Sequence, residues 1–394
     1  MRILLTLVLL SLMLYGCTES SNPVNPLQSN LPMWPMPGFN ARNTSSPYAP
    51  DAVMNPIING ALSWSYTFPA GSVSDGSTFC VDSRGYIYYL HQLYPLGALY
   101  KLSPDGNVIW KKDSLIHWNY AAISLSTNES RIYFTADKPG YSRRLYCLDS
   151  AGNFVWNVDS ALVIKPAVGK DGTLYMFRLN GLSAINSDGQ IKWTNSTIME
   201  SPSENTYLAL DHSDNIYAFS YPLTLYKVNK SGSVLWQITL PRIARGLVID
   251  GFGNAYFTGY DDYTMYCINQ AGQVKWTRPN MNNYSSPVIT SNNRIVVSSQ
   301  AYIISYDTSG TEQWRCQAFT NLLGAEGLLL DGANNSYYIG DGSGGIIAGS
   351  VSSTGVKRWE VNTNLFSSLP PPVLLPQGKL LIAPKRASKI QSIN

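Results

Sequence analysis

One short phrase, Gly-x-x-x-Trp, occurs eight times in this chain of 394 residues. Its copies are Gly60/Trp64, Gly106/Trp110, Gly152/Trp156, Gly189/Trp193, Gly232/Trp236, Gly272/Trp276, Gly310/Trp314 and Gly355/Trp359. Successive tryptophans of this set are separated by 46, 46, 37, 43, 40, 38 and 45 residues. This period is typical of the four-stranded blades of a β-propeller and is too long for leucine-rich or tetratricopeptide units.

Each repeat also contains two phrases that are typical of β-strands, because apolar and polar residues alternate in them. Copies of the first phrase, apolar-Tyr-x-apolar, lie at residues 99–102, 145–148, 225–228 and 265–268. Copies of the second phrase, a polar turn between two apolar runs, lie at residues 81–88, 210–217 and 249–256. The glycine that follows the first phrase supplies the positive φ of a tight hairpin. Each repeat therefore predicts four strands, the last of which carries the tryptophan.

The two ends of the chain decide the number of blades. After Trp359 three further strands are predicted, at residues 373–375, 379–382 and 390–394, and no tryptophan strand follows them. A tryptophan strand without a blade lies at residues 59–64. We therefore expect an all-β, eight-bladed β-propeller with four antiparallel strands per blade, whose last blade joins the N- and C-terminal strands. Such closure leaves no free edge strand.

The first residues have the features of an export signal. Arg2 precedes an apolar run at residues 3–14, and the tetrapeptide Leu14-Tyr15-Gly16-Cys17 follows. This tetrapeptide resembles the bacterial lipobox, in which the cysteine is acylated. We predict a lipoprotein signal peptide at 1–16, a flexible tether at 17–33 and a single propeller domain at 34–394, with Cys17 as the lipidated residue; the alternative is an ordinary secretory signal. Thr18 follows the cysteine, and by family resemblance this favours the outer membrane.

Composition limits the classes of partner. Charged residues make up 13% of the chain and its net charge is +3, which argues against nucleic acid. Contact with a membrane is expected through the lipid anchor only. Four further cysteines, Cys80, Cys147, Cys267 and Cys316, lie in strand-like surroundings, and we expect them to be buried free thiols rather than disulfides.

The repeated phrases resemble the quinoprotein-type, or PQQ-like, β-propeller repeat, as in Leu145-Tyr146-Cys147-Leu148-Asp149-Ser150-Ala151-Gly152-Asn153-Phe154-Val155-Trp156. The resemblance implies that the eight tryptophans are structural, with each indole buried between blades. Two classes of protein share this fold. One is the quinoprotein dehydrogenases, which hold a quinone and calcium, but their adjacent-cysteine pair and haem motif are absent here. The other is binding lipoproteins, including the BamB type of outer-membrane assembly lipoprotein, which is similar in length, blade number and anchor.

Other motifs give little support to catalysis. The Gly340–Gly345 phrase matches Gly-x-Gly-x-x-Gly, yet a strand follows it where a dinucleotide site needs a helix, so a turn is expected. His91, His117 and His212 lie in predicted loops or turns without metal-ligand spacing. The pair Asp261-Asp262 could hold calcium or a sugar, and a solvated loop is the alternative. We therefore predict no metal and no cofactor.

Long loops on one face are the best candidates for recognition. The predicted binding rim comprises His91, Tyr94, Tyr141, Arg143, Arg144, Tyr260, Asp261, Asp262 and Tyr263. Ordinary loop variation is the alternative interpretation. The sequence thus predicts a lipid-anchored, non-catalytic binding or scaffold protein of the bacterial cell envelope, whose partner is an envelope protein or a glycan. The alternative function is a quinone- or calcium-dependent oxidoreductase.

Overall fold

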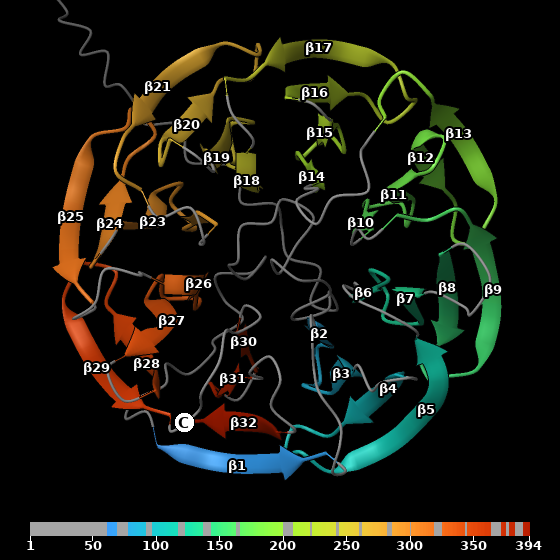
Figure 1. Ribbon diagram of the computed structural model, residues 1–394, viewed down its shortest axis with the longest axis horizontal. Helices are drawn as coiled ribbons and strands as arrows, with labels where there is room; N and C mark the ends of the chain where they lie inside the picture. The colour runs from blue at the N-terminus through green and yellow to red at the C-terminus, as the bar shows by residue number, and fades with distance from the viewer. Residues whose placement is uncertain are drawn as a thin grey trace, which may run out of the picture.

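A computed structural model describes residues 61–68, 78–91, 97–116, 123–136, 143–162, 166–199, 208–220, 223–241, 244–259, 262–281, 286–299, 301–318, 325–342, 345–363, 372–375, 378–382 and 389–394. These residues form 32 strands in eight antiparallel sheets of four. Figure 1 shows the sheets as blades of a closed ring, with the first strand of each blade near the centre and the fourth on the circumference. The predicted eight-bladed propeller is confirmed.

The blades follow the chain, and blade 1 is the first complete one. Blade 1 comprises β2 (Thr78–Val81), β3 (Ile87–His91), β4 (Gly97–Leu102) and β5 (Val108–Ile116), and blade 2 comprises β6 (Ile123–Leu125), β7 (Arg131–Ala136), β8 (Arg144–Asp149) and β9 (Phe154–Asp159). Blade 3 comprises β10 (Ala167–Val168), β11 (Leu174–Arg178), β12 (Gly181–Ile185) and β13 (Ile191–Asn195), and blade 4 comprises β14 (Leu208–Leu210), β15 (Ile216–Ser220), β16 (Thr224–Val228) and β17 (Val234–Thr239). Blade 5 comprises β18 (Ala244–Ile249), β19 (Ala255–Gly259), β20 (Met265–Ile268) and β21 (Val274–Arg278). Blade 6 comprises β22 (Val288–Ile289), β23 (Ile295–Ser299), β24 (Tyr302–Tyr306) and β25 (Glu312–Gln317), and blade 7 comprises β26 (Ala325–Leu330), β27 (Ser336–Gly342), β28 (Gly345–Val351) and β29 (Lys357–Asn362).

The eighth blade joins the two ends of the ordered ring. It contains β30 (Val373–Leu374), β31 (Leu380–Ile382) and β32 (Lys389–Ile393), with β1 (Leu62–Thr67) as its outer strand. In the antiparallel register of β1 and β32, Trp64 lies opposite Ser392 and Tyr66 opposite Ile390. The predicted closure by both termini is therefore confirmed, and no blade in the described ring has an unpaired inner strand.

The core lies between the faces of neighbouring blades. Every residue of β3 and β11 is buried, whereas most residues of an outer strand such as β9 are exposed and only Val158 of that strand is buried. One apolar cluster brings together Tyr89 of blade 1, Ile339 of blade 7 and Leu381 of blade 8. Each blade is therefore stabilised mainly by burial against its two neighbours.

The Gly-x-x-x-Trp phrase forms a contact between consecutive blades. The indole of Trp193 covers Gly232 of the next blade so closely that a Cβ on that glycine would lie 2.9 Å from the ring, and Gly232 has φ +91°. The indole N–H donates a hydrogen bond to the Lys230 carbonyl at 2.9 Å. The same bond, to the carbonyl two residues before the next glycine, is made by Trp64, Trp156, Trp236, Trp276 and Trp314.

The indoles differ in part from the sequence expectation, which placed each of them buried between blades. They lie on the outer strands, and all eight are half-buried. Each ring has the next blade on one side and solvent on the other, because the fourth strand is the outermost strand of its blade. The tryptophans therefore seal the circumference of the ring rather than fill its core. The half-buried set is Trp64, Trp110, Trp156, Trp193, Trp236, Trp276, Trp314 and Trp359.

Trp110 of blade 1 departs further from the repeated pattern. Its indole N–H is shielded from solvent and has no hydrogen-bond partner among the described residues. A Cβ on Gly152 of the next blade would meet the Lys112 side chain at 2.9 Å before the Trp110 ring at 3.3 Å. The Lys112 stem therefore takes the position closest to the glycine, which the ring itself occupies at the equivalent contact of Trp193. Trp110 keeps its packing against the core of blades 1 and 2 but lacks the hydrogen bond between blades.

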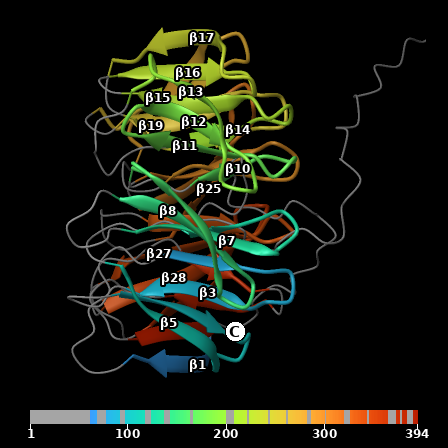
Figure 2. The ribbon, with the colours of Figure 1, turned by 90° about the vertical axis from the view of Figure 1, so that its right-hand side faces the viewer.

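A second contact between blades involves turns that join first and second strands. The positive-φ residues Glu129, Asp214, Asn293 and Asn334 occupy such turns. Each accepts a hydrogen bond from a backbone N–H in the equivalent turn of the preceding blade, and in the case of Asn334 the donor is Ser291 at 2.8 Å. In the edge-on view of Figure 2, most turns drawn in colour lie on one side of the ring. We call this side the turn face, and the side where second strands connect to third strands the loop face.

Two smaller predictions are also confirmed. Cys80, Cys147, Cys267 and Cys316 are free and buried. Strand β27 pairs directly with β28, with Gly342 opposite Gly345, so the glycine-rich phrase joins two strands of a hairpin and opens no helix. Within the described ranges, no helix has the length and hydropathy that a membrane crossing requires.

Candidate functional site

The described members of the predicted binding rim do not lie together. They are His91 at the end of β3, Arg143 and Arg144 at the start of β8, and Asp262 and Tyr263 before β20, so they flank the connections between second and third strands in blades 1, 2 and 5. Blades 1 and 2 are neighbours, whereas blade 5 lies across the ring from blade 1 (Figure 1). Asp262 and Tyr263 are thus separated from the other described members. Tyr94, Tyr141, Tyr260, Asp261 and the predicted lipidation residue Cys17 lie outside the described residues.

His91 is not a surface residue, contrary to the sequence expectation. It is the last residue of β3 rather than part of a loop, and it is 1% exposed. Its imidazole stacks on Phe68 with ring centroids 4.0 Å apart and planes 10° apart, and neither ring nitrogen has a hydrogen-bond partner in the described ranges. Burial, with a smaller effect of Lys111, lowers the pKa of His91 to about 4. The side chain is therefore a neutral part of the core and is unavailable to a partner.

The two arginines of the rim lie at the junction of blades 2 and 3. The Arg144 guanidinium forms an ion pair with Asp159, with 2.5 Å between Nε and Oδ1. The backbone carbonyl of Asp159 accepts two hydrogen bonds from Arg178, both 3.1 Å long. Arg143 is half-buried, and its carbonyl accepts a hydrogen bond from the Ala161 N–H at 3.0 Å. Arg144 is thus held in place by Asp159, and three arginines and one aspartate meet at this junction.

The acidic pair of blade 5 has a structural role at its described member. Asp262 accepts hydrogen bonds from the Tyr266 hydroxyl at 2.6 Å and from the Thr264 N–H at 3.1 Å. Tyr263 has φ 51° and is 51% exposed. Among the described residues, no group of three His, Cys, Asp or Glu side chains could hold a metal ion. Asp262 therefore shapes its loop, and Tyr263 is the exposed aromatic residue there.

On the turn face, several blades share a buried carboxylate network. In blade 5, Asp250 Oδ1 accepts the N–H groups of Phe252 and Asn254. Its Oδ2 accepts the Tyr256 hydroxyl at 2.8 Å and the Asn254 side-chain amide at 2.7 Å. Blade 7 repeats this arrangement with Asp331, Asn335 and Tyr337. These aspartates cap hairpin turns, and Asp82 does the same in blade 1, where it accepts the N–H groups of Arg84 and Tyr86.

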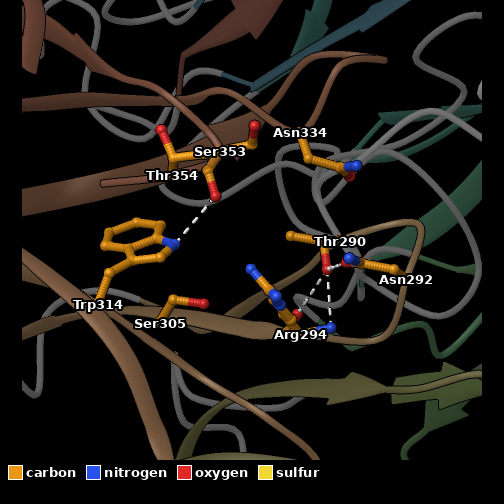
Figure 3. A pocket seen from close by; sticks show the side chains of 8 residues that line it. All are labelled: Thr290, Asn292, Arg294, Ser305, Trp314, Asn334, Ser353 and Thr354. Atoms are coloured by element: carbon orange, nitrogen blue, oxygen red, sulfur yellow. Dashed lines mark hydrogen bonds between the residues drawn. The ribbon is translucent and has the colours of Figure 1, made fainter. Parts of the chain in front are cut away.

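Blade 6 replaces all three members of this network. Thr290, Arg294 and Val296 occupy the positions of Asp250, Asn254 and Tyr256. A cavity of about 180 Å³ opens at this place, between blades 6 and 7. Figure 3 shows its lining residues, which are Thr290, Asn292, Arg294, Ser305, Trp314, Asn334, Ser353 and Thr354.

Two polar groups in this pocket have no partner among the described residues. Ser305 is fully buried, and its hydroxyl makes no hydrogen bond within that part of the chain. Across the described part of the chain, no hydrogen bond or ion pair engages the Arg294 guanidinium, which extends into the middle of the pocket toward Ser305 and Trp314 (Figure 3). The mouth is held by Asn334, which exchanges two 2.8 Å hydrogen bonds with Ser291 across the blade boundary.

The sequence contains a signal for this pocket that catalytic, cofactor-binding and metal-binding motifs do not include. Motif searches ask which reactive residues are present, whereas here the signal is the replacement of the Asp, Asn and Tyr of blades 5 and 7 by Thr290, Arg294 and Val296 in blade 6. Aligning residues 290–296 with residues 250–256 and 331–337 reveals the replacement. The unpaired hydroxyl of Ser305 could not be read from sequence, because it depends on what lies opposite it in the folded blade.

Comparison with known families agrees with this architecture. A family model described as outer membrane protein assembly factor BamB matches residues 96–248 and 223–366, which together span more than half of the chain. The chain belongs to this family. It is a PQQ-like repeat β-propeller that resembles BamB, as the repeated phrases predicted. No curated protein matches the chain in sequence.

Solved structures share the fold at low sequence identity. BamB from Moraxella catarrhalis gives a TM-score of 0.60 at 10% identity, and the match covers 85% of this chain and 99% of that one. A quinohemoprotein alcohol dehydrogenase from Pseudomonas putida HK5 gives 0.63 at 12% identity, covering 93% of this chain and 80% of that one. A streptogramin B lyase gives 0.51 at 13% identity, covering 69% and 92%. These structural similarities include two enzymes as well as BamB. They therefore establish the fold, and an activity has to be argued from the residues of the site.

Proposed function

We propose that this protein is a lipid-anchored, non-catalytic binding or scaffold protein of the bacterial cell envelope, attached at the outer membrane through Cys17. The observation that carries the proposal is the match of residues 96–366 to the family described as an outer membrane protein assembly factor. The partner is a protein of the envelope, and the ring serves as a rigid platform for it. Rigid scaffolds that present loops are a common basis for recognition.

The recognition surface is the loop face of blades 1 and 2. We assign Tyr94, Tyr141, Arg143 and Arg144 to it, because aromatic and arginine side chains dominate binding hot spots. Tyr263 lies across the ring and provides a separate contact. This division follows from the positions of blades 2 and 5 in the ring.

Cross-linked capture from native membranes tests this surface. We expect Tyr94→Ala and Arg143→Glu to weaken capture of the partner without a change in melting temperature, because surface substitutions usually alter stability by less than about 0.5 kcal/mol. The matched control is Arg131→Glu, which alters an arginine on the turn face of blade 2. Capture that survives both loop-face substitutions would move the site elsewhere, and a glycan as the only captured species would exclude a protein partner.

The anchor has its own test. Replacing Cys17 with Ser should release the protein from the membrane fraction and abolish labelling with a fatty-acid analogue. Membrane retention of this variant without acyl label would rule out the lipoprotein proposal.

A quinone- or calcium-dependent oxidoreductase is the second candidate, favoured by the fold shared with the quinohemoprotein alcohol dehydrogenase. Purified protein incubated with pyrroloquinoline quinone and calcium should show no oxidation of alcohols or sugars if the scaffold proposal holds. Turnover with either substrate class would establish the enzyme instead.

A further inference from the structure

We propose that the pocket between blades 6 and 7 binds a carboxylate group, presented by a small, flat, partly apolar molecule or by the end of a peptide. The proposal concerns the turn face and does not depend on the scaffold role of the loop face. Its basis is the difference between blade 6 and its sibling blades, together with two unpartnered polar groups inside the pocket.

The sibling blades show which group is missing. In blades 5 and 7 the turn supplies its own carboxylate, and the oxygens of Asp250 and Asp331 receive the amide and hydroxyl of the neighbouring Asn and Tyr. In blade 4 the carboxylate of Asp211 also pairs with Lys227 at 3.1 Å. Blade 6 has Thr290 at this position, and its hydroxyl accepts only the turn N–H of Arg294, at 2.7 Å. Relative to blades 5 and 7, blade 6 therefore lacks the aspartate carboxylate and has the guanidinium of Arg294 in place of an asparagine.

The space for a ligand comes from the missing tyrosine. Across blade 6 the paired residues are Val296, Ser305 and Trp314, and the corresponding residues in blade 5 are Tyr256, Cys267 and Trp276. The rings of Tyr256 and Trp276 lie 5.7 Å apart, so the tyrosine occupies the space beside the indole. Val296 leaves that space open, and the cavity is of the size known to hold a benzene-sized molecule.

The chemistry of the lining selects a carboxylate. It contains one guanidinium and no acidic side chain. A guanidinium presents its donors as a planar fork that matches a carboxylate with two parallel hydrogen bonds. The buried hydroxyl of Ser305 can donate a further bond, which would satisfy a group that otherwise loses its hydration without compensation. The indole of Trp314 provides an apolar wall for a flat ring.

Binding of benzoate and of its neutral analogue benzamide to the full chain, measured by calorimetry, tests the proposal. We expect benzoate to bind with a Kd of about 1 mM or tighter and benzamide at least about tenfold more weakly, because only the anion pairs with Arg294. Failure of benzoate to saturate the protein at tens of millimolar, or equal affinity for the two compounds, would overturn the proposal. Tighter binding of inorganic phosphate than of benzoate would also overturn it.

Variants that copy the sibling blades make the test specific. Arg294→Asn installs the residue of blades 4, 5 and 7 and should weaken benzoate binding at least about tenfold, while Arg294→Lys should retain part of the affinity. Val296→Tyr should fill the pocket and abolish binding. Arg131→Asn, which removes an arginine at the blade 2 turn, is the matched control and should bind like the native chain. If both Arg294→Asn and Val296→Tyr bound benzoate as tightly as the native chain, the pocket would not be the binding site. If one variant failed to fold, unchanged affinity in the other would contradict the proposal.

A further pair of probes identifies the source of the carboxylate. N-acetylphenylalanine carries a chain-terminal carboxylate, and its amide lacks one. Tighter binding of N-acetylphenylalanine than of benzoate would indicate a peptide end as the natural ligand, and weaker binding would indicate a free small acid. Equal binding of N-acetylphenylalanine and its amide would contradict a carboxylate site.

Discussion

At the scale of single residues, contacts that recur around the ring can be distinguished from contacts unique to one blade. Gly232 and Gly172 both have positive φ, of 91° and 80°. Gly232 lies under the indole of Trp193, whereas a Cβ on Gly172 would meet nothing within 4 Å. A side chain placed at Gly172 therefore changes stability through the backbone conformation alone. A side chain placed at Gly232 also disturbs the contact between blades.

We predict that Gly232→Ala destabilises the protein more than Gly172→Ala does. Both variants pay roughly 1 kcal/mol for placing a side chain at positive φ, but Gly232→Ala must also push the ring away, at an additional cost of about 1–3 kcal/mol. Guanidinium denaturation of both variants measures the difference. Equal losses would mean that the indole moves freely and that the Trp–Gly contact does not hold the blades together.

The buried imidazole of His91 predicts a dependence of stability on pH. Its folded-state pKa of about 4 lies below the ordinary value of about 6.5. Between these pH values the unfolded chain binds a proton that the folded protein does not, so stability is complete above about pH 6.5 and decreases toward pH 4, by up to about 3 kcal/mol. His91→Phe should keep the stacking on Phe68 and remove this dependence.

Denaturation curves at pH 7 and pH 5 measure the effect. His91→Phe should lose less stability than the native chain over this interval and should be about 1 kcal/mol more stable at pH 7, because two buried nitrogens without partners are removed. His212→Asn, at an exposed turn residue, is the control and should retain the native pH dependence. A native pH profile in His91→Phe would show that other groups cause it.

At the scale of elements, each turn acts as a connector as well as a hairpin. Glu129 closes the turn before β7 and also accepts two hydrogen bonds from Ser83 of blade 1, with its φ at 58°. Its position explains why a long polar residue tolerates a strained backbone there: the strain is offset by the bonds to the neighbouring blade. The same logic applies to Asp214, Asn293 and Asn334.

We predict a definite order of stability among substitutions at this turn. Glu129→Gln should be closest to the native protein because it keeps an acceptor for Ser83. Glu129→Gly loses the bonds but relieves the backbone, and Glu129→Ala loses the bonds and keeps the strain, so Ala should be about 1 kcal/mol less stable than Gly. Thermal melts of the three variants test this order. An Ala variant as stable as the Gly variant would argue against strain at this turn.

At the scale of the whole molecule, blade 8 holds the ring closed. Strand β32 lies between β1 and β31, and its residues Ile390 and Ile393 join the core shared by blades 7, 8 and 1. Without β32 the outer strand β1 would have no partner, and the faces of two neighbouring blades would be exposed to solvent.

Deletion of residues 389–394 should therefore destabilise the whole ring. Loss of each buried isoleucine alone costs about 2–5 kcal/mol, and the unpaired strands should promote aggregation. Removal of Asn394 alone is the control, because it loses one hydrogen bond, to the Ala61 carbonyl at 2.7 Å. Chemical denaturation and light scattering measure both effects. A truncated protein that unfolds like the full chain would show that the ring is stable while open.

The sequence by itself determined the parts of this protein that depend on local repetition. The spacing of glycine and tryptophan fixed the number of blades and the order of strands, because each copy dictates one hairpin and one contact with the next copy. The unmatched strands at the two ends likewise predicted the closure of blade 8. The burial of the cysteines followed from their positions in alternating strands.

Only the tertiary structure decided features that depend on which blades meet. His91 has the polarity of a loop residue, but packing against Phe68 extends its strand and buries it. Trp110 has the same local phrase as its seven counterparts, yet its indole N–H is left without a partner. The loops of blades 2 and 5 both contain tyrosine, but the ring places the two blades apart.

The pocket around Arg294 arises for the same reason. The neighbouring strand carries Val296 where blades 5 and 7 carry tyrosine, and the hydroxyl of Ser305 opposite it has no partner among the described residues. Such properties depend on distances between segments far apart in the chain, which a local pattern does not contain.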